Sequence, residues 1–136
     1  MTKASTAVWI GRAMSGLFVL FMLGASIAPK LFFPEAGKAH EIMDQLGWPY
    51  KYLLLIAAIE LIGTILYAVP RTSILGAVLM TGLLGGAVAS QLRVDNPLFS
   101  HILFGIYLGL LMWGGLWLRD PALRALIPLR RPGSNA

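Results

Sequence analysis

Four long runs of apolar residues, separated by short polar connections, dominate the pattern of the chain. The runs cover residues 8–28, 52–69, 72–92 and 98–118. Each comes close to the roughly 20 residues that an α-helix needs to cross about 30 Å of hydrocarbon. The pattern therefore predicts an all-α fold: a bundle of four transmembrane helices in a single membrane domain over residues 1–136, with residues 119–136 as a tail.

The first apolar run also resembles a secretory signal peptide. Lys3 and Arg12 stand near its start, and residues 26–28 (Ser-Ile-Ala) resemble a small-residue cleavage site. Pro29 follows this site directly and disfavours cleavage there. We therefore expect the first run to be a transmembrane helix.

The connection between the first two runs has the pattern of a short amphipathic helix. Pro34 suits the first turn of a helix, and Gly47 suits the position after its end. The apolar residues between them recur at helical spacing: Ala36, Ala39, Ile42, Met43 and Leu46. We expect an interfacial helix on the outer membrane surface, followed by an aromatic belt that anchors the second span: Trp48, Tyr50 and Tyr52.

A second short helix is expected after the fourth run. Asp120 suits its N-cap, Pro121 suits its first turn, and the amphipathic segment continues to Ile127. Arg130 and Arg131 follow, where a basic tail would lie near anionic lipid.

Charged residues are scarce and unevenly placed. They make up 12% of the 136 residues, against about 25% in soluble domains. The net charge is +5, but the basic residues stand at the ends of apolar runs and not together on one face, so we exclude nucleic acid as a partner. The lipid bilayer is the expected surrounding.

The basic residues also orient the bundle. On the side of both termini there are seven: Lys3, Arg12, Arg71, Arg119, Arg124, Arg130 and Arg131. On the opposite side there are four: Lys30, Lys38, Lys51 and Arg93. The positive-inside rule then places both termini in the cytoplasm of a multi-pass protein of the inner membrane.

Residue usage excludes several chemistries. The chain has no cysteine, which excludes disulfides, thiolate zinc sites, iron–sulfur clusters and the paired-thiol chemistry of membrane disulfide-generating enzymes. Its two histidines, His40 and His101, are too few for haem or a dedicated metal centre. We expect no metal site, and no electron-carrying cofactor held within the chain.

Glu60 is the most informative single residue, because it lies near the middle of the second apolar run. A central acidic residue costs about 2.5 to 3.5 kcal/mol on insertion scales, which the flanking Leu and Ile residues offset. We expect its carboxyl group to face the bundle interior, either paired with a cation or protonated. An ionisable residue at this depth indicates a functional site by default, and a structural hydrogen bond to a neighbouring helix is the alternative.

Other polar residues stand at the outer ends of the remaining spans. They are Lys30, Ser90, Gln91, Arg93, Ser100 and His101. We assign catalytic roles to Glu60, Arg93 and His101, and ligand binding to Lys30, Ser90, Gln91 and Ser100. Lys30 and Arg93 could instead extend to the headgroups, and His101 could be an interfacial hydrogen-bonding residue.

A carboxylate, an imidazole and a guanidinium around one outer-leaflet cavity suit an amphipathic ligand that exchanges protons. A quinone is a candidate, because its carbonyl oxygens accept hydrogen bonds and its reduction consumes protons. The electrons would then come from a soluble or membrane redox partner.

Small residues recur at four-residue spacing in the last two runs. One stripe contains Gly82, Gly86 and Ser90, and the other contains Gly105 and Gly109. Such stripes let helix backbones approach closely. We expect close packing through one of them, within the bundle or between the protomers of a homo-oligomer.

Several strings, taken in order, resemble the DoxX-like family of small four-helix membrane proteins. They are residues 28–32 (APKLF), 46–49 (LGWP), Glu60 with Gly63, 69–71 (VPR), 85–93 (GGAVASQLR) and 113–120 (WGGLWLRD). The resemblance covers nearly the whole chain. The wider family includes a subunit of thiosulfate:quinone oxidoreductase, so the resemblance implies a quinone-linked oxidoreductase role. The family often has His at the position of Gln91, so this chain has one titratable group fewer there.

Two other functions remain open. In one, the chain is a non-catalytic membrane scaffold or small-molecule binder, in which the polar residues specify packing. In the other, it is a small proton-coupled exporter. We rank this lowest, because the acidic residue lies in the second span and no polar residues mark a pathway from Glu60 to the cytoplasmic side.

Overall fold

The computed structural model describes residues 5–33 and 39–130, and within these ranges all regular secondary structure is helical, without strands. Four helices are long and apolar enough to cross a membrane: Thr6–Phe32, Tyr50–Ala68, Pro70–Arg93 and Leu98–Arg119. The all-α fold with four spans is thus confirmed. The α-helical elements are α1 (Thr6–Phe21), α2 (Ala28–Phe32), α3 (Ala39–Leu46), α4 (Leu53–Ala68), α5 (Ser73–Arg93), α6 (Phe104–Arg119) and α7 (Pro121–Leu126).

The first span is longer than its apolar run, because the helix continues through Pro29. A π-helical turn, Met22–Ile27, joins α1 to α2, and the Ala28 N–H donates to the carbonyl of Leu23, five residues back. Proline cannot donate the next helical hydrogen bond, and a widened turn is a known way to absorb that loss. The turn keeps the helix intact and determines which side of α2 faces α4.

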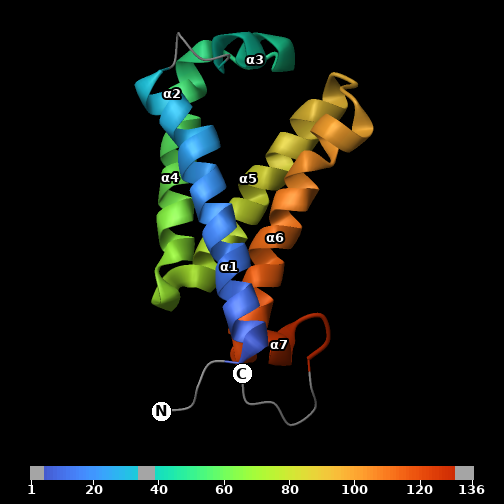
Figure 1. Ribbon diagram of the computed structural model, residues 1–136. Coiled ribbons are helices and arrows are strands. Elements are labelled where there is room, and N and C mark those ends of the chain that lie inside the picture. The colour runs from blue at the N-terminus through green and yellow to red at the C-terminus, as the bar shows by residue number, and fades with distance from the viewer. Residues whose placement is uncertain (1–4, 34–38, 131–136) are drawn as a thin grey trace.

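The predicted interfacial helix is present as α3, which lies across one end of the bundle (Figure 1). Gly47 follows it with a φ of 75°, the left-handed conformation expected of a residue that ends a helix. Met43 is the buried residue of α3. Two expected parts of this segment, Pro34 and Ala36, lie outside the described residues.

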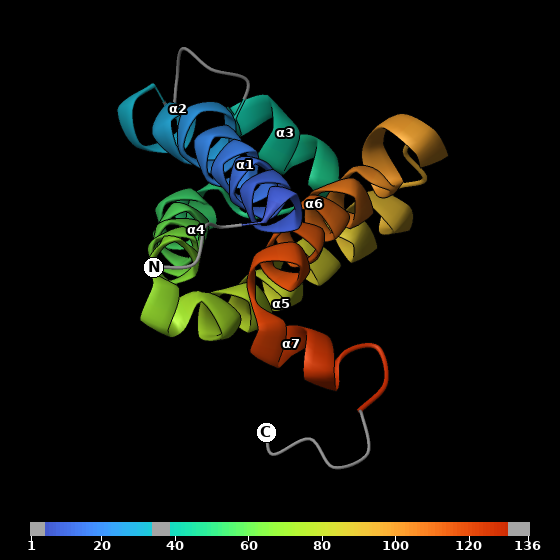
Figure 2. The same ribbon diagram turned by 60° about the horizontal axis from the view of Figure 1, so that its bottom comes forward.

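The spans pack in sequence around the bundle: α1 lies along α6, α6 along α5, and α5 along α4 (Figures 1 and 2). The core between them is apolar, with Phe18, Met80 and Met112 fully buried. Many outward leucines and isoleucines are exposed, such as Leu20 at 68% and Leu110 at 66%. Lipid-facing surfaces are expected to have this character.

The glycines divide into two groups. A Cβ at Gly105 would lie 2.8 Å from Val88 and 3.1 Å from the Leu84 carbonyl, so the predicted close approach of α6 to α5 is confirmed there. Gly82 and Gly86 meet nothing within 4 Å, so packing of their stripe within the bundle is not found. They face outward because the side of α5 that buries Ala77, Met80 and Leu84 is a different one.

Another close helix approach was not expected from the sequence. A Cβ at Gly11 would lie 2.6 Å from the Gly115 carbonyl oxygen, where α1 crosses α6. A Cβ at Gly115 would lie 2.6 Å from the Ser15 hydroxyl oxygen. These small residues bring the two backbones together at the end where α1 begins and α6 ends.

The predicted short helix after the fourth span is α7. The Asp120 carboxylate accepts from the Ala122 N–H at 3.0 Å, and Pro121 occupies the first turn. Ile127 is its C-cap. The expected cap and first turn are therefore confirmed.

Candidate functional site

Glu60 lies in the middle of α4 and forms an ion pair with Lys30 of α2. The Lys30 ammonium donates to both carboxylate oxygens at 2.9 Å. The side chain of Glu60 is 9% exposed and that of Lys30 is 21% exposed. The expectations that Glu60 faces inward and has a cation beside it are confirmed, and the cation is Lys30.

Ser26, on the π-helical turn, completes this group. Its hydroxyl donates toward the Glu60 oxygens at 3.1 and 3.2 Å and accepts from the Lys30 ammonium at 2.8 Å. We call Ser26, Lys30 and Glu60 the Glu60 cluster. Because removal of one partner from a buried pair costs about 3–5 kcal/mol, the cluster joins the first span firmly to α4.

The other predicted catalytic residues do not join this cluster. Arg93, exposed at the end of α5, donates to the carbonyl of Leu46 at the end of α3. His101 is exposed and forms a hydrogen bond of 2.7 Å with Ser100. The end of α5 and the start of α6 lie away from α4 in both views, so the expected site of Glu60, Arg93 and His101 is not assembled (Figures 1 and 2).

The remaining predicted ligand-binding residues lie at the end of the bundle that carries α3. The buried Ser90 hydroxyl accepts from the Trp48 indole N–H at 3.1 Å and donates to the carbonyl of Gly86 at 2.9 Å. Gln91 accepts from the side-chain amide of Asn96. These bonds connect α3 and the turn after α5 to the bundle. The ligand-binding roles of Ser90, Gln91 and Ser100 stay predictions.

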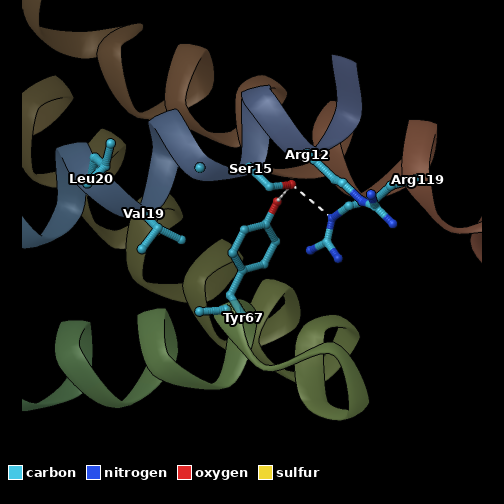
Figure 3. Close-up of a pocket in the computed structure, with 8 residues that line it drawn as sticks. Arg12, Ser15, Val19, Leu20, Tyr67 and Arg119 are labelled. Carbon is cyan, nitrogen blue, oxygen red and sulfur yellow. Dashed lines mark hydrogen bonds between the residues drawn. The ribbon is translucent and has the colours of Figure 1, made fainter. Parts of the chain in front are cut away.

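A second polar group lies at the opposite end of the same interior face. The Tyr67 hydroxyl donates to the Met112 carbonyl at 2.6 Å, so the Ser15 hydroxyl, 2.8 Å away, donates to Tyr67. Arg119 in turn donates to Ser15 at 3.0 Å (Figure 3). We call Ser15, Tyr67 and Arg119 the Tyr67 cluster. Ser15 is 7% exposed and Tyr67 is fully buried.

The Tyr67 cluster forms one wall of a pocket of about 390 Å³ between α1, α4 and α6. Arg12 of α1 lines the same pocket (Figure 3). This pair of guanidinium groups was not expected from the sequence, which counted Arg12 and Arg119 only among the basic residues that orient the bundle in the membrane.

Comparison with known proteins supports the family expected from the sequence motifs. The model of the DoxX-like family matches residues 13–115. The chain belongs to the DoxX-like family. No curated protein and no solved structure matches the chain significantly.

The family match covers some of the polar residues of this DoxX-like protein and leaves others outside. The matched segment contains the whole Glu60 cluster, together with Ser15 and Tyr67. Arg12 and Arg119 fall outside it. The two guanidinium groups of the pocket therefore lie just beyond the two ends of the matched segment.

A periodicity argument would have found the missed residues. Ser15, Ser26 and Lys30 lie on one face of the first span, because they are separated by three turns and one turn. Glu60, Thr64 and Tyr67 likewise share one face of α4. Each face carries polar residues from one half of the membrane to the other, a signal that single-residue inspection does not reveal.

In this DoxX-like protein Thr64 lies on α4 between Glu60 and Tyr67, and so between the two clusters. It is 1% exposed, and its hydroxyl has no hydrogen-bond partner among the described residues. Polar residues thus continue from Glu60 toward the end where α1 begins. This weakens one of the two reasons for which the proton-coupled exporter was ranked lowest, and the other, the place of the acidic residue in the second span, stands.

Proposed function

We propose that this DoxX-like protein is the membrane subunit of an oxidoreductase system and that its Glu60 cluster binds a quinone or a similar lipid-soluble carbonyl compound. One observation carries the proposal: an ion pair held at mid-membrane depth whose lysine side chain remains 21% exposed. Ionisable residues at this depth usually mark ligand or proton pathways.

The chemistry of the cluster suits a quinone headgroup. The Lys30 ammonium has three N–H donors, and a quinone carbonyl oxygen is an acceptor for one of them. Reduction of a quinone to a quinol takes up two electrons and two protons. Lys30 and Glu60 are the proton-exchanging groups within reach, and the Ser26 hydroxyl bridges them.

We assign the supply of the electrons for quinone reduction to a partner protein. The chain has no cysteine, and the described residues contain no group of three His, Asp or Glu side chains able to hold a metal ion. In this arrangement the membrane subunit binds the carrier and supplies protons, while the partner holds the electron-transfer cofactor.

The test separates binding from folding by using a charge-free pair. Lys30→Met and Glu60→Gln each leave a buried group without its partner, and each is expected to lower thermal stability. The double variant K30M/E60Q removes both charges, so most of the stability returns. Quinone binding does not return, because the donor and the proton-exchanging groups are gone.

Binding is measured by native mass spectrometry of the full chain with a short-chain ubiquinone, next to thermal unfolding of each variant. His101→Asn, distant from the cluster, is the control and is expected to bind as the unaltered chain does. A K30M/E60Q protein that folds and still retains the quinone would contradict the proposal. It would leave the cluster with the packing role of a membrane scaffold.

A further inference from the structure

The pocket beside the Tyr67 cluster joins a cationic end to an apolar end. Arg12 and Arg119 line the cationic end, and their side chains extend toward the same region (Figure 3). Val19 and Leu20 of α1 line the apolar end. Its volume of about 390 Å³ falls within the range of small-ligand pockets, roughly 300–1,000 Å³.

The wall of the pocket is rigid because its polar groups are already fixed. The chain of hydrogen bonds from Arg119 through Ser15 and Tyr67 ends on the Met112 carbonyl. The Tyr67 ring packs edge-on against Phe18 with centroids 5.3 Å apart. Arg119 is thereby oriented by the hydrogen bond from its Nε atom to Ser15. One of its terminal nitrogens makes a longer hydrogen bond of 3.4 Å to the Ser73 hydroxyl. Its guanidinium retains further N–H donors for a ligand.

The charges at this end are not neutralised by the described part of the protein. Its ion pairs are Lys30 with Glu60 and His40 with Asp44, so neither Arg12 nor Arg119 has a described carboxylate within 4.0 Å. Arg12 stacks over the Trp9 ring at 4.8 Å. Two positive groups that converge on one pocket repel each other, and an anion between them removes that cost.

We propose that this pocket binds the phosphate group of an amphipathic molecule, with the hydrocarbon part lying along Val19 and Leu20. The planar guanidinium presents paired donors that match phosphate oxygens, and a phosphate has enough acceptors for two such groups. The site is separate from the Glu60 cluster and does not depend on the function proposed for it.

The charge test compares the same substitution at two arginines, one that lines the pocket and one that does not. Arg12→Gln is expected to lower the affinity for dioleoyl phosphatidic acid about tenfold or more, since one of two phosphate-binding groups is lost. Arg71→Gln is the matched control, because Arg71 lies at the same end of the bundle but does not line the pocket. Affinity is measured by native mass spectrometry of the full chain during lipid titration. Equal losses in the two variants would indicate diffuse surface attraction and overturn the proposal.

A steric test leaves every polar group in place. Gly16 lines the pocket, and a Cβ there meets nothing within 4 Å, so Gly16→Leu fills the space without disturbing the helix packing. Gly24 on the same span is equally open and does not line the pocket, so Gly24→Leu is its control. Loss of lipid binding in G16L alone supports the site, and unchanged binding in G16L would overturn it.

Competing ligands identify the chemistry. Displacement of the lipid by inorganic phosphate would indicate that a free phosphate occupies the site, whereas retention of the lipid would indicate a phospholipid headgroup. Both outcomes support a phosphate site. Oleate binding as tightly as the phosphate lipid, or phosphatidic acid binding no better than phosphatidylcholine, would overturn it.

Discussion

At the scale of single residues, hydrogen bonding separates polar groups that stabilise the bundle from those that do not. The Thr81 hydroxyl donates to the Ala77 carbonyl and accepts from the Trp113 indole N–H, both at 2.7 Å. The Thr64 hydroxyl is more deeply buried and has no partner among the described residues. A buried polar group without a hydrogen bond costs free energy, so the two threonines should respond in opposite ways to the same substitution.

Thr64→Val is expected to leave the free energy of unfolding unchanged or to raise it by about 1 kcal/mol, because it removes an unpaired hydroxyl at nearly constant shape. Thr81→Val is expected to lower it by roughly 0.5–1.5 kcal/mol, because two hydrogen bonds are lost. Thermal unfolding in one detergent measures both. A T64V protein less stable than T81V would show that Thr64 has a partner, such as a bound water.

At the scale of elements, backbone approach decides which glycines matter. Gly11 and Gly115 lie where α1 crosses α6, whereas Gly82 and Gly86 border open space on α5. Outward small-residue faces allow helices of separate protomers to pack closely. A homo-oligomer, the alternative that the sequence left open for these stripes, would have the face with Gly82 and Gly86 available for packing.

Gly11→Leu is expected to destabilise the monomer by about 1–3 kcal/mol or more, because a side chain there overlaps the α6 backbone. Gly82→Leu should leave monomer stability unchanged, since no atom lies within 4 Å of its Cβ. Thermal unfolding and the mass of the detergent-solubilised protein are measured together. Loss of a dimer in G82L would support packing through this face, and an unchanged dimer would exclude it.

At the scale of the whole molecule, the two ends of the bundle differ in character. One end carries α3 and the residues bound to it. The other carries α7, the start of α1 and the Arg12 pocket (Figure 1). Five of the seven basic residues assigned to the cytoplasmic side stand near this second end within the described residues: Arg12, Arg71, Arg119, Arg124 and Arg130.

We expect a cysteine placed at Gln45 on α3 to react with a membrane-impermeant thiol reagent in intact cells, and one placed at Ser134 to react only after permeabilisation. The chain has no native cysteine, so the background is clean. The physical reason is the seven-to-four distribution of Lys and Arg. The opposite labelling pattern would invert the bundle and place the Arg12 pocket in the outer leaflet.

The sequence alone determined the features that depend on neighbouring residues. Apolar run lengths predicted four spans, Gly47 predicted the end of α3, and Asp120 with Pro121 predicted the start of α7. These features need no knowledge of distant segments, since hydrocarbon thickness and backbone capping act locally.

Only the tertiary structure decided which distant side chains meet. The packing of the first span against α4 gives Glu60 the partner Lys30, whereas Arg93, at the end of α5, reaches the Leu46 carbonyl. The crossing of α1 over α6 brings Arg12 and Arg119 into one pocket from opposite ends of the chain. Helix rotation and crossing follow from the packing of whole faces, a sum over many contacts that no local pattern contains.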